Sequence, residues 1–277
     1  MPSVPDLPQY IAQELDYPLT YTQSGAGQPL LLIHGSLCDY RYWRWQIPAF
    51  SNQVHVIAPS LRGYWPNALH AESAAFSIAQ HTRDLIDFVR SRGEPMHVLG
   101  HSRGAHIALA LASAVPEMTR SLILADPGFR LPGDPQSHSF QFDVVEKLKR
   151  GDLEGALAQF VDTVNGPGTW RQMVSWFKTM VKDNAYTLLS QIHEVDAPFD
   201  SGCLQKIDMP VLLMGGANSP DRYRRRLDVL ESLLTQAHRV TVPLAAHGMN
   251  LANPKAFNEQ VLQFLGQHTQ MREARAT

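Results

Sequence analysis

The stretch VLGHSRGAH at residues 98–106 decides the fold, because a short apolar run turns there into an apolar helical pattern with a serine at the junction. Gly100 and Gly104 flank Ser102 two positions away on either side, which is the G-x-S-x-G arrangement of a nucleophile elbow. A turn this sharp needs glycines because larger side chains would collide with the neighbouring strand and helix. Small residues at a strand-to-helix turn also serve packing, but in this context Ser102 is the candidate nucleophile.

Short apolar runs that end in turn residues recur along the chain, as expected for strands buried on both faces of a sheet. They are PLLLIHG (29–35), VHVIAPS (54–60), MHVLGHS (96–102), SLILADPG (121–128), PVLLMGG (210–216) and HRVTVPL (238–244). Helical patterns separate them, including one that ends at Gly93 and one that Asn253 and Pro254 open. This alternation predicts an α/β protein with a mostly parallel, doubly wound sheet.

The alternation is interrupted after Gly128 by a long helical pattern rich in Phe, Trp and Met. Strand and helix alternate again from about residue 206. We therefore predict one α/β core formed by residues 1–128 and 206–277, with a helical cap inserted at 129–205.

The composition excludes several classes of partner. The 277 residues carry a formal charge of −2, and the isoelectric point is about 6.6, so we expect neither a nucleic acid nor a membrane as partner. The basic run RYRRR at 222–226 lies in a helical pattern relieved by Asp228 and Glu231, and we interpret it as a solvated helix face. The oligomeric state is left open, a homodimer included.

Two cysteines, Cys38 and Cys203, provide neither a disulfide framework nor a metal cluster. The N-terminus lacks a basic segment followed by an apolar one, and no stretch approaches the roughly 18 apolar residues of a membrane span. We expect a cytoplasmic protein that binds no metal.

The GHSRG motif, His34-Gly35 after the first long apolar run and a lone histidine after the last run together resemble the α/β-hydrolase fold superfamily. The resemblance extends from about residue 17 to 266 and is to serine-nucleophile, cap-bearing esterases and lactonases, since dehalogenases and epoxide hydrolases carry Asp at the elbow. Ser60 departs from the pattern, because relatives often have Asp there, but that position is not catalytic. The resemblance implies a cofactor-independent serine hydrolase.

The resemblance also implies the partners of Ser102. His247, in PLAAHGMN, stands where the superfamily places its base, whereas His34 and His101 are best interpreted as structural. The backbone N–H groups of Arg103 and Ser36 would form the oxyanion hole. The Arg103 guanidinium is more simply a surface ion pair than a contact to a substrate carboxylate.

The acid that orients the base has three candidates. Many relatives have Asp after the strand that corresponds to PVLLMGG, but the turn here reads Ala-Asn-Ser-Pro at 217–220. Asn218 could orient an imidazole without offsetting its charge, and Asp221 looks like part of a helix start capped by Ser219. Asp126 ends the strand after the elbow helix, where certain lactonases carry their acid, so Asp126 is preferred.

Aromatic side chains at helical spacings in the predicted cap lead us to expect a small apolar or aromatic ester or lactone as substrate. The candidate substrate contacts are His34, Tyr64, Trp65, Trp170 and Trp176, although packing explains each of them at least as well. Two alternatives stay open. One is carbon–carbon bond hydrolysis or cofactor-free dioxygenation on the same fold, and the other is a non-catalytic small-molecule receptor.

Overall fold

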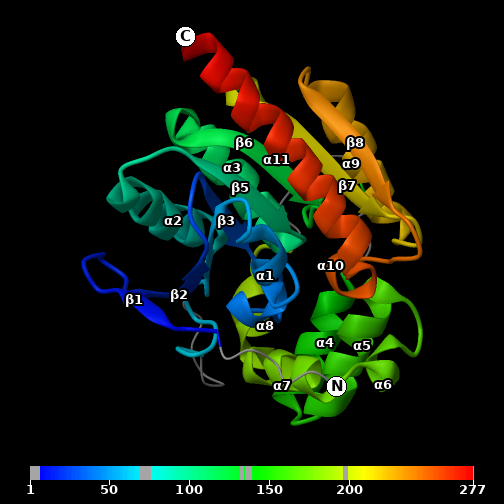
Figure 1. Ribbon diagram of the computed structural model, residues 1–277. Coiled ribbons are helices and arrows are strands. Elements are labelled where there is room, and N and C mark those ends of the chain that lie inside the picture. Colours follow the sequence, from blue (N-terminus) through cyan, green and yellow to red (C-terminus); the bar gives the residue numbers. More distant parts are fainter. Residues whose placement is uncertain (1–6, 69–75, 132–133, 135–138, 196–198, 277) are drawn as a thin grey trace.

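An eight-stranded sheet forms the centre of the molecule, with strand order β1-β2-β4-β3-β5-β6-β7-β8 (Figure 1). The computed structural model describes residues 7–68, 76–131, 134, 139–195 and 199–276, so parts of each predicted segment lie outside the described residues. The strands are β1 (Tyr10–Ala12), β2 (Leu19–Ser24), β3 (Pro29–Ile33), β4 (His55–Pro59), β5 (Met96–His101), β6 (Thr119–Ala125), β7 (Val211–Gly216) and β8 (Ala237–Val242).

The six strands expected from apolar runs are all present, and they pair in parallel in the order β4-β3-β5-β6-β7-β8. Strands β1 and β2 were not predicted, and they extend the sheet through antiparallel pairs. Strand β1 has only three residues, two of them exposed, so it contains no apolar run from which it could be predicted. The fold is thus the mostly parallel α/β sheet that the sequence predicts, with an antiparallel edge added.

Alternating side chains of the strands supply two apolar clusters, one on each face of the sheet. On one face, Leu30 and Leu32 of β3 join the cluster that contains α1 (Ile47–Phe50) and α11 (Pro254–Ala276). On the other face, Leu31 and Ile33 join the cluster of α2 (Ile78–Arg92), α3 (Arg103–Ala114) and α9 (Asp221–Leu233). Burial on both faces fixes the register of β3, since a shift of one residue would exchange the two faces.

The helix ends follow the local sequence signals. The Ser77 hydroxyl caps α2 by accepting a hydrogen bond from the Gln80 backbone, and Gly93 ends it with a left-handed φ of 73°. Pro254 begins α11, as expected.

Five α-helices lie between β6 and β7 among the residues that the structure describes, and Figure 1 shows them gathered at one end of the sheet. We call these residues, 140–191, the helical cap. The helices are α4 (Phe140–Lys149), α5 (Leu153–Asn165), α6 (Thr169–Gln172), α7 (Ser175–Asp183) and α8 (Leu188–Gln191). Buried side chains such as Phe160, Met180 and Leu188 join them to the apolar cluster on the α1 and α11 face, so the cap is seated on the core.

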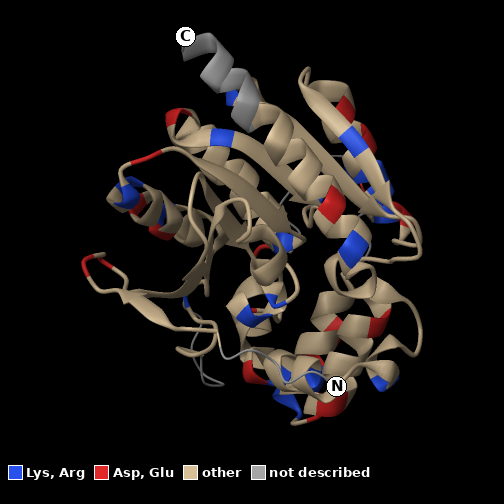
Figure 2. Ribbon diagram, viewed as in Figure 1, with Lys and Arg blue, Asp and Glu red and all other residues tan. Residues whose placement is uncertain are grey.

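Basic and acidic residues are interspersed over the helices and loops (Figure 2). Within the part of the chain that the structure describes, no helix is both long enough and apolar enough to cross a membrane.

Candidate active site

Ser102 lies at the turn between β5 and α3 with φ 56° and ψ −122°, a strained conformation for a residue with a side chain. A methyl group on Gly104 would overlap the backbone carbonyls of Ile33 and His34, and one on Gly100 would overlap the backbone of Gly104. The structure therefore confirms why glycines flank the serine. The close approach of β3, β5 and α3 presents the hydroxyl at the carboxyl end of the sheet.

Asp126 follows β6 directly and is fully buried, with a left-handed φ of 40°. Two backbone hydrogen bonds tie this segment to the elbow: Ser102 donates to the Ala125 carbonyl over 2.9 Å, and Gly128 donates to the Ser102 carbonyl over 2.9 Å. The end of β6 is thus fixed beside the serine, which holds the Asp126 carboxyl at the same edge of the sheet.

His247 lies on the loop after β8 and is 5% exposed. Its ring stacks on that of Tyr223 with centroids 4.1 Å apart, and its centroid is 4.6 Å from that of His101. The His101 ring also hydrogen-bonds through Nε2 to the His247 carbonyl over 2.8 Å. Nδ1 of His247 lies 3.3 Å from Oδ2 of Asp126, within hydrogen-bond reach and close to the 3.2 Å expected of a working pair. Both the ring and the backbone of His247 are therefore held in place.

Burial dominates the electrostatics of this pair. It raises the pKa of Asp126 to about 7, although a hydrogen bond of 2.5 Å from the Ser219 hydroxyl to Oδ2 acts in the opposite direction. Burial also lowers the pKa of His247 well below its usual range, and the nearby guanidinium groups of Arg222 and Arg226 lower it further. The imidazole is consequently neutral at pH 7, as a general base must be.

The structure places the other two acid candidates elsewhere. Asn218 is exposed, and its backbone N–H donates to the Ala245 carbonyl over 2.8 Å. Asp221 is exposed in the first turn of α9 and pairs with Arg224 at 2.9 Å. Asp221 begins the helix as expected, but the predicted cap is wrong, because the Ser219 hydroxyl bonds to Asp126 instead.

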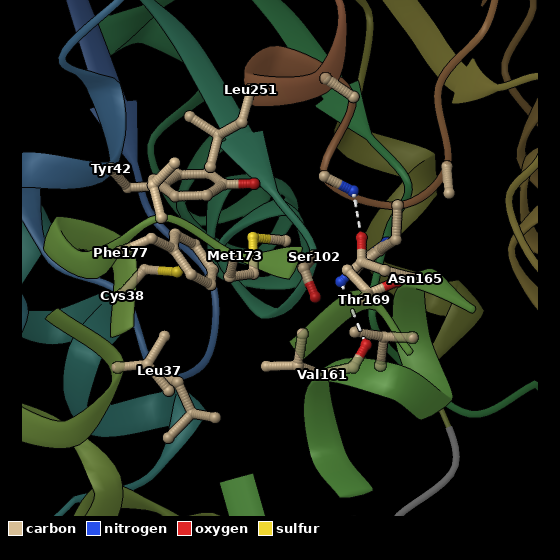
Figure 3. Close-up of a pocket in the computed structure, with 18 of the residues that line it drawn as sticks. Leu37, Cys38, Tyr42, Ser102, Val161, Asn165, Thr169, Met173, Phe177 and Leu251 are labelled. Carbon is tan, nitrogen blue, oxygen red and sulfur yellow. Dashed lines mark hydrogen bonds between the residues drawn. The ribbon is translucent and has the colours of Figure 1, made fainter. Parts of the chain in front are cut away.

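Ser102 opens into a cavity of about 970 Å³ between the cap and the core. Figure 3 shows its hydroxyl projecting among side chains from α5, α6, α7 and the loop after β3. The wall is largely apolar and includes Leu37, Tyr42, Val161, Met173, Phe177 and Leu251, and His247 also lines it. The nucleophile and base candidates thus face one chamber large enough for a small organic molecule.

The predicted oxyanion-hole residues flank Ser102. The loop that carries Ser36 lies so close to the elbow that a methyl group on Gly35 would come within 3.0 Å of the Ser102 Cβ. The Ser36 hydroxyl donates to Gln191 Oε1 over 2.6 Å, and Gln191 in turn donates to the Tyr64 hydroxyl over 2.8 Å. Gln191 of the cap helix α8 therefore fixes the loop that carries Ser36, a contact that no local sequence signal indicated.

Arg103 forms an ion pair, as expected, but the pair is not on the surface. The side chain is buried, with Nη2 3.2 Å from the Glu194 carboxylate and Nη1 2.9 Å from Nδ1 of His81.

The structure corrects four of the five expected substrate contacts. His34 is fully buried, and its Nε2 accepts a hydrogen bond from the Leu61 backbone. Tyr64 bonds to Gln191, Trp65 packs under the Arg41 guanidinium, and Trp170 donates to Glu154. Among the described residues that line the cavity at Ser102, only Trp176 comes from this set. The four residues fill positions between elements, because large aromatic side chains are buried wherever the cap and loops meet the core.

The part of the chain that the structure describes contains no group of three or more His, Cys, Asp or Glu side chains placed to hold a metal ion. Cys38 and Cys203 are both free thiols.

Comparison with known proteins identifies the family and the fold. A family model described as "Alpha/beta hydrolase family" matches residues 30–260. A relative from Acinetobacter baylyi, named (E)-2-((N-methylformamido)methylene)succinate hydrolase, is 22% identical over 88% of this chain and 93% of its own. Among solved structures, a thermophilic esterase from Thermogutta terrifontis gives a TM-score of 0.76 at 18% identity, covering 94% of this chain and 99% of that chain. A bromoperoxidase from Bacillus anthracis gives 0.77 at 20% identity, covering 94% and 100%.

Proposed function

Since this chain belongs to the alpha/beta hydrolase family, we propose that it is a serine hydrolase that cleaves a carboxylic ester or lactone of a small apolar or aromatic substrate. One observation carries the proposal: Ser102 and His247 line the same cavity while Nδ1 of His247 faces the buried Asp126 carboxylate. A nucleophile, a base and an acid that orients the base are the parts that acyl transfer requires.

In the first half of the reaction, the neutral His247 ring takes the proton of the Ser102 hydroxyl while Oγ attacks the substrate carbonyl. Asp126 holds the proton on Nδ1, which leaves Nε2 free as the base, and its negative charge stabilises the imidazolium. The backbone N–H groups of Ser36 and Arg103 stabilise the oxyanion, each worth about 3 to 4 kcal/mol. The imidazolium then protonates the leaving oxygen, and an acyl-enzyme remains.

In the second half, His247 takes a proton from water as the water oxygen attacks the acyl carbonyl. The intermediate collapses, the Ser102 oxygen recovers the proton, and the carboxylic acid leaves. The ester and one water molecule supply every atom of the acid and alcohol products, so no external redox partner takes part.

The apolar wall of the cavity supports a substrate with a modest apolar or aromatic body. Side chains such as Val161, Met173, Phe177 and Leu251 would cover it, and Trp176 offers an aromatic face.

The proposal is tested by incubating the protein with 4-nitrophenyl acetate and butyrate and comparing wild type with Ser102→Ala. Turnover that is lost in the variant supports a serine hydrolase. If the variant kept more than about a tenth of the activity, Ser102 would not be the nucleophile. That result would favour proton abstraction from the substrate by His247 and Asp126, as in carbon–carbon bond hydrolysis or cofactor-free dioxygenation. An inert protein that binds ligand tightly would instead favour the receptor reading.

A further inference from the structure

A second cavity, of about 550 Å³, meets the first at Ser102. Ser36, Ser102, Phe160 and Val164 line both. The second cavity differs in its charge. Among the described residues, five arginines and two carboxylates contribute to its wall: Arg103, Arg130, Arg222, Arg225, Arg226, Asp134 and Glu194. We call it the arginine cavity.

Two of the five guanidinium groups neutralise the two carboxylates. Arg103 pairs with Glu194 at 3.2 Å, and Arg225 forms a close ion pair with Asp134. Within the described chain, therefore, these ion pairs use up both acidic groups of the wall.

Among the residues described, no carboxylate forms a direct ion pair with Arg222 or Arg226, although the charge of Asp134 stabilises the charged form of Arg226 and the charge of Arg226 stabilises ionised Asp126. Nη2 of Arg222 donates to the Thr163 carbonyl over 2.7 Å, while Nη1 of Arg226 reaches the Pro127 carbonyl only at 3.5 Å. The Arg226 Nε is buried without a hydrogen-bond partner in the described structure. Burial lowers the pKa of Arg226, and the positive charge of Arg222 lowers it further.

A guanidinium group without a directly paired carboxylate is costly in a partly buried site unless an opposite charge binds beside it. The planar guanidinium group presents paired donors that match the oxygens of a carboxylate or phosphate. The cavity therefore offers an anion both charge and hydrogen bonds.

The helix α9 arranges these charges by its periodicity. Positions 222, 225 and 226 are three and four residues apart and share one helix face, which lines the cavity. Arg224, in contrast, has a side chain that is 61% exposed and pairs with Asp221 on the same helix. The interpretation of RYRRR as a solvated face thus fits Arg224 and also Arg225, whose side chain is 54% exposed at the rim of the cavity. It is corrected for Arg222 and Arg226, which are partly buried in the cavity wall.

We propose that the arginine cavity is an anion subsite, in which Arg222 and Arg226 bind a carboxylate or phosphate group of the substrate while its reacting carbonyl lies at Ser102. This inference rests on the proposed function, since it names the class of ester that the enzyme prefers. The apolar cavity takes the uncharged part of the molecule, and the two parts meet at the nucleophile.

The test compares pairs of substrates that differ at one group, which is a carboxylate in one member and uncharged in the other. The 4-nitrophenyl monoester of glutaric acid and 4-nitrophenyl valerate place the difference on the acyl side. The acetate ester of 4-hydroxybenzoate and that of its methyl ester place it on the leaving-group side. In wild type, kcat/KM for the anionic member of at least one pair should exceed that for the neutral member by about tenfold or more.

Arg226→Gln and Arg222→Gln should each reduce this ratio about tenfold, whereas Arg226→Lys should retain part of it. The matched control is Arg224→Gln, which removes the same charge from the exposed face of the same helix and should leave the ratio unchanged. Because the two substrates of a pair share the Ser102 and His247 chemistry, any general effect of a variant on catalysis cancels in the ratio. Equal kcat/KM within both pairs, or a ratio that Arg226→Gln does not alter, would overturn the subsite.

A binding measurement keeps this test separate from that of the proposed function. Calorimetric titration of the wild-type protein with sodium glutarate and with inorganic phosphate should show binding of at least one anion, and the stronger of the two identifies the preferred group. Binding should weaken in Arg226→Gln but not in Arg224→Gln. If neutral esters are hydrolysed and anionic esters are not preferred, the proposed hydrolase function stands and the anion subsite is rejected. Anion binding that depends on Arg226 in a protein inert to every ester would retain the subsite and reject ester hydrolysis.

Discussion

Oδ2 of Asp126 lies 3.3 Å from Nδ1 of His247, although 121 residues separate the two in the chain. The acid comes from the end of β6, and the turn after β7 contributes Ser219, whose hydroxyl binds the same oxygen of Asp126. Segments that follow two neighbouring strands therefore meet here: one supplies the carboxylate, and the other supplies a hydrogen-bond donor that stabilises its charge.

Asp126→Asn should leave the protein folded and reduce kcat for ester hydrolysis by roughly 10³- to 10⁴-fold, because an amide cannot offset the charge of the imidazolium and its NH2 group can donate to Nδ1, which favours the wrong tautomer. Asn218→Ala serves as the control and should cost less than about tenfold, since Asn218 is exposed away from the pair. Steady-state kinetics of both variants would identify Asn218 as the orienting residue if the two effects were reversed.

The pH profile should report the Asp126–His247 pair. The active form needs an ionised Asp126 and a neutral His247, and burial raises the pKa of Asp126 to about 7 while it keeps His247 neutral. We therefore expect kcat/KM to rise with pH through an apparent pKa near 7. A profile that is flat between about pH 5 and 8 would contradict the assignment.

Ser219→Ala should shift the rise of kcat/KM with pH to higher pH. The hydroxyl donates to the ionised carboxylate and so lowers its pKa, and its removal should raise the apparent pKa by about one unit. A rise that stays in place or moves to lower pH would show that Ser219 does not tune the acid.

The arrangement of the strands was predictable because strands buried on both faces leave continuous apolar runs, such as PLLLI in β3. Strand β1 was not, since its YIA sequence has no such run and its position depends on pairing with β2. Local signals predict an element only where local burial decides it.

The same distinction applies to the site. The elbow at Ser102 was predictable because its constraint is local, namely two glycines that no larger residue can replace. The parts played by Ser219, Tyr223 and Gln191 depend on side chains that come together only after folding, so no spacing in the sequence indicated them. Arg222 and Arg226 of α9 show the opposite limitation, because they belong to a run that resembles a solvated face and yet line a cavity.

Acid should destabilise the fold through its buried histidines. Burial lowers the pKa of His34 and of His101 to about 3, so between about pH 6.5 and 3 the unfolded chain binds protons that the folded protein excludes. Between pH 7 and pH 5, each of these two histidines lowers the free energy of unfolding by about 2 kcal/mol.

Asp126 has the opposite effect on stability. Its raised pKa means that, as the pH falls, the folded protein binds a proton before the unfolded chain does, and this offsets about 2 kcal/mol of the lost free energy of unfolding. The free energy of unfolding, measured with urea at both pH values, should therefore fall by at least roughly 2 kcal/mol at pH 5, since burial also lowers the pKa of His81, His106 and His247 and each adds a loss of the same sign. Equal or greater stability at pH 5 would show that these histidines are not held neutral by burial.

Gly104→Ala should destabilise the protein by about 3 kcal/mol or more, since the new methyl group overlaps backbone atoms that cannot move independently. Gly266→Ala is the matched control. It lies in α11 with no atom within 4 Å of an added methyl group, and the higher helix propensity of alanine should stabilise the protein by up to about 1 kcal/mol. Thermal unfolding of the two variants distinguishes a glycine required by close packing from one that is not, and similar stabilities would contradict the packing argument.

The central claim is that Ser102 is a nucleophile activated by His247, and intact-protein mass spectrometry after brief exposure to a fluorophosphonate tests it most directly. We expect the wild-type protein to gain the mass of one phosphonyl group on the peptide that contains Ser102. Ser102→Ala should show no labelling, and His247→Ala should be labelled far more slowly, because the base has been removed. Labelling of Ser102→Ala at the wild-type rate, or an unlabelled wild-type protein that nevertheless hydrolyses esters, would contradict the account.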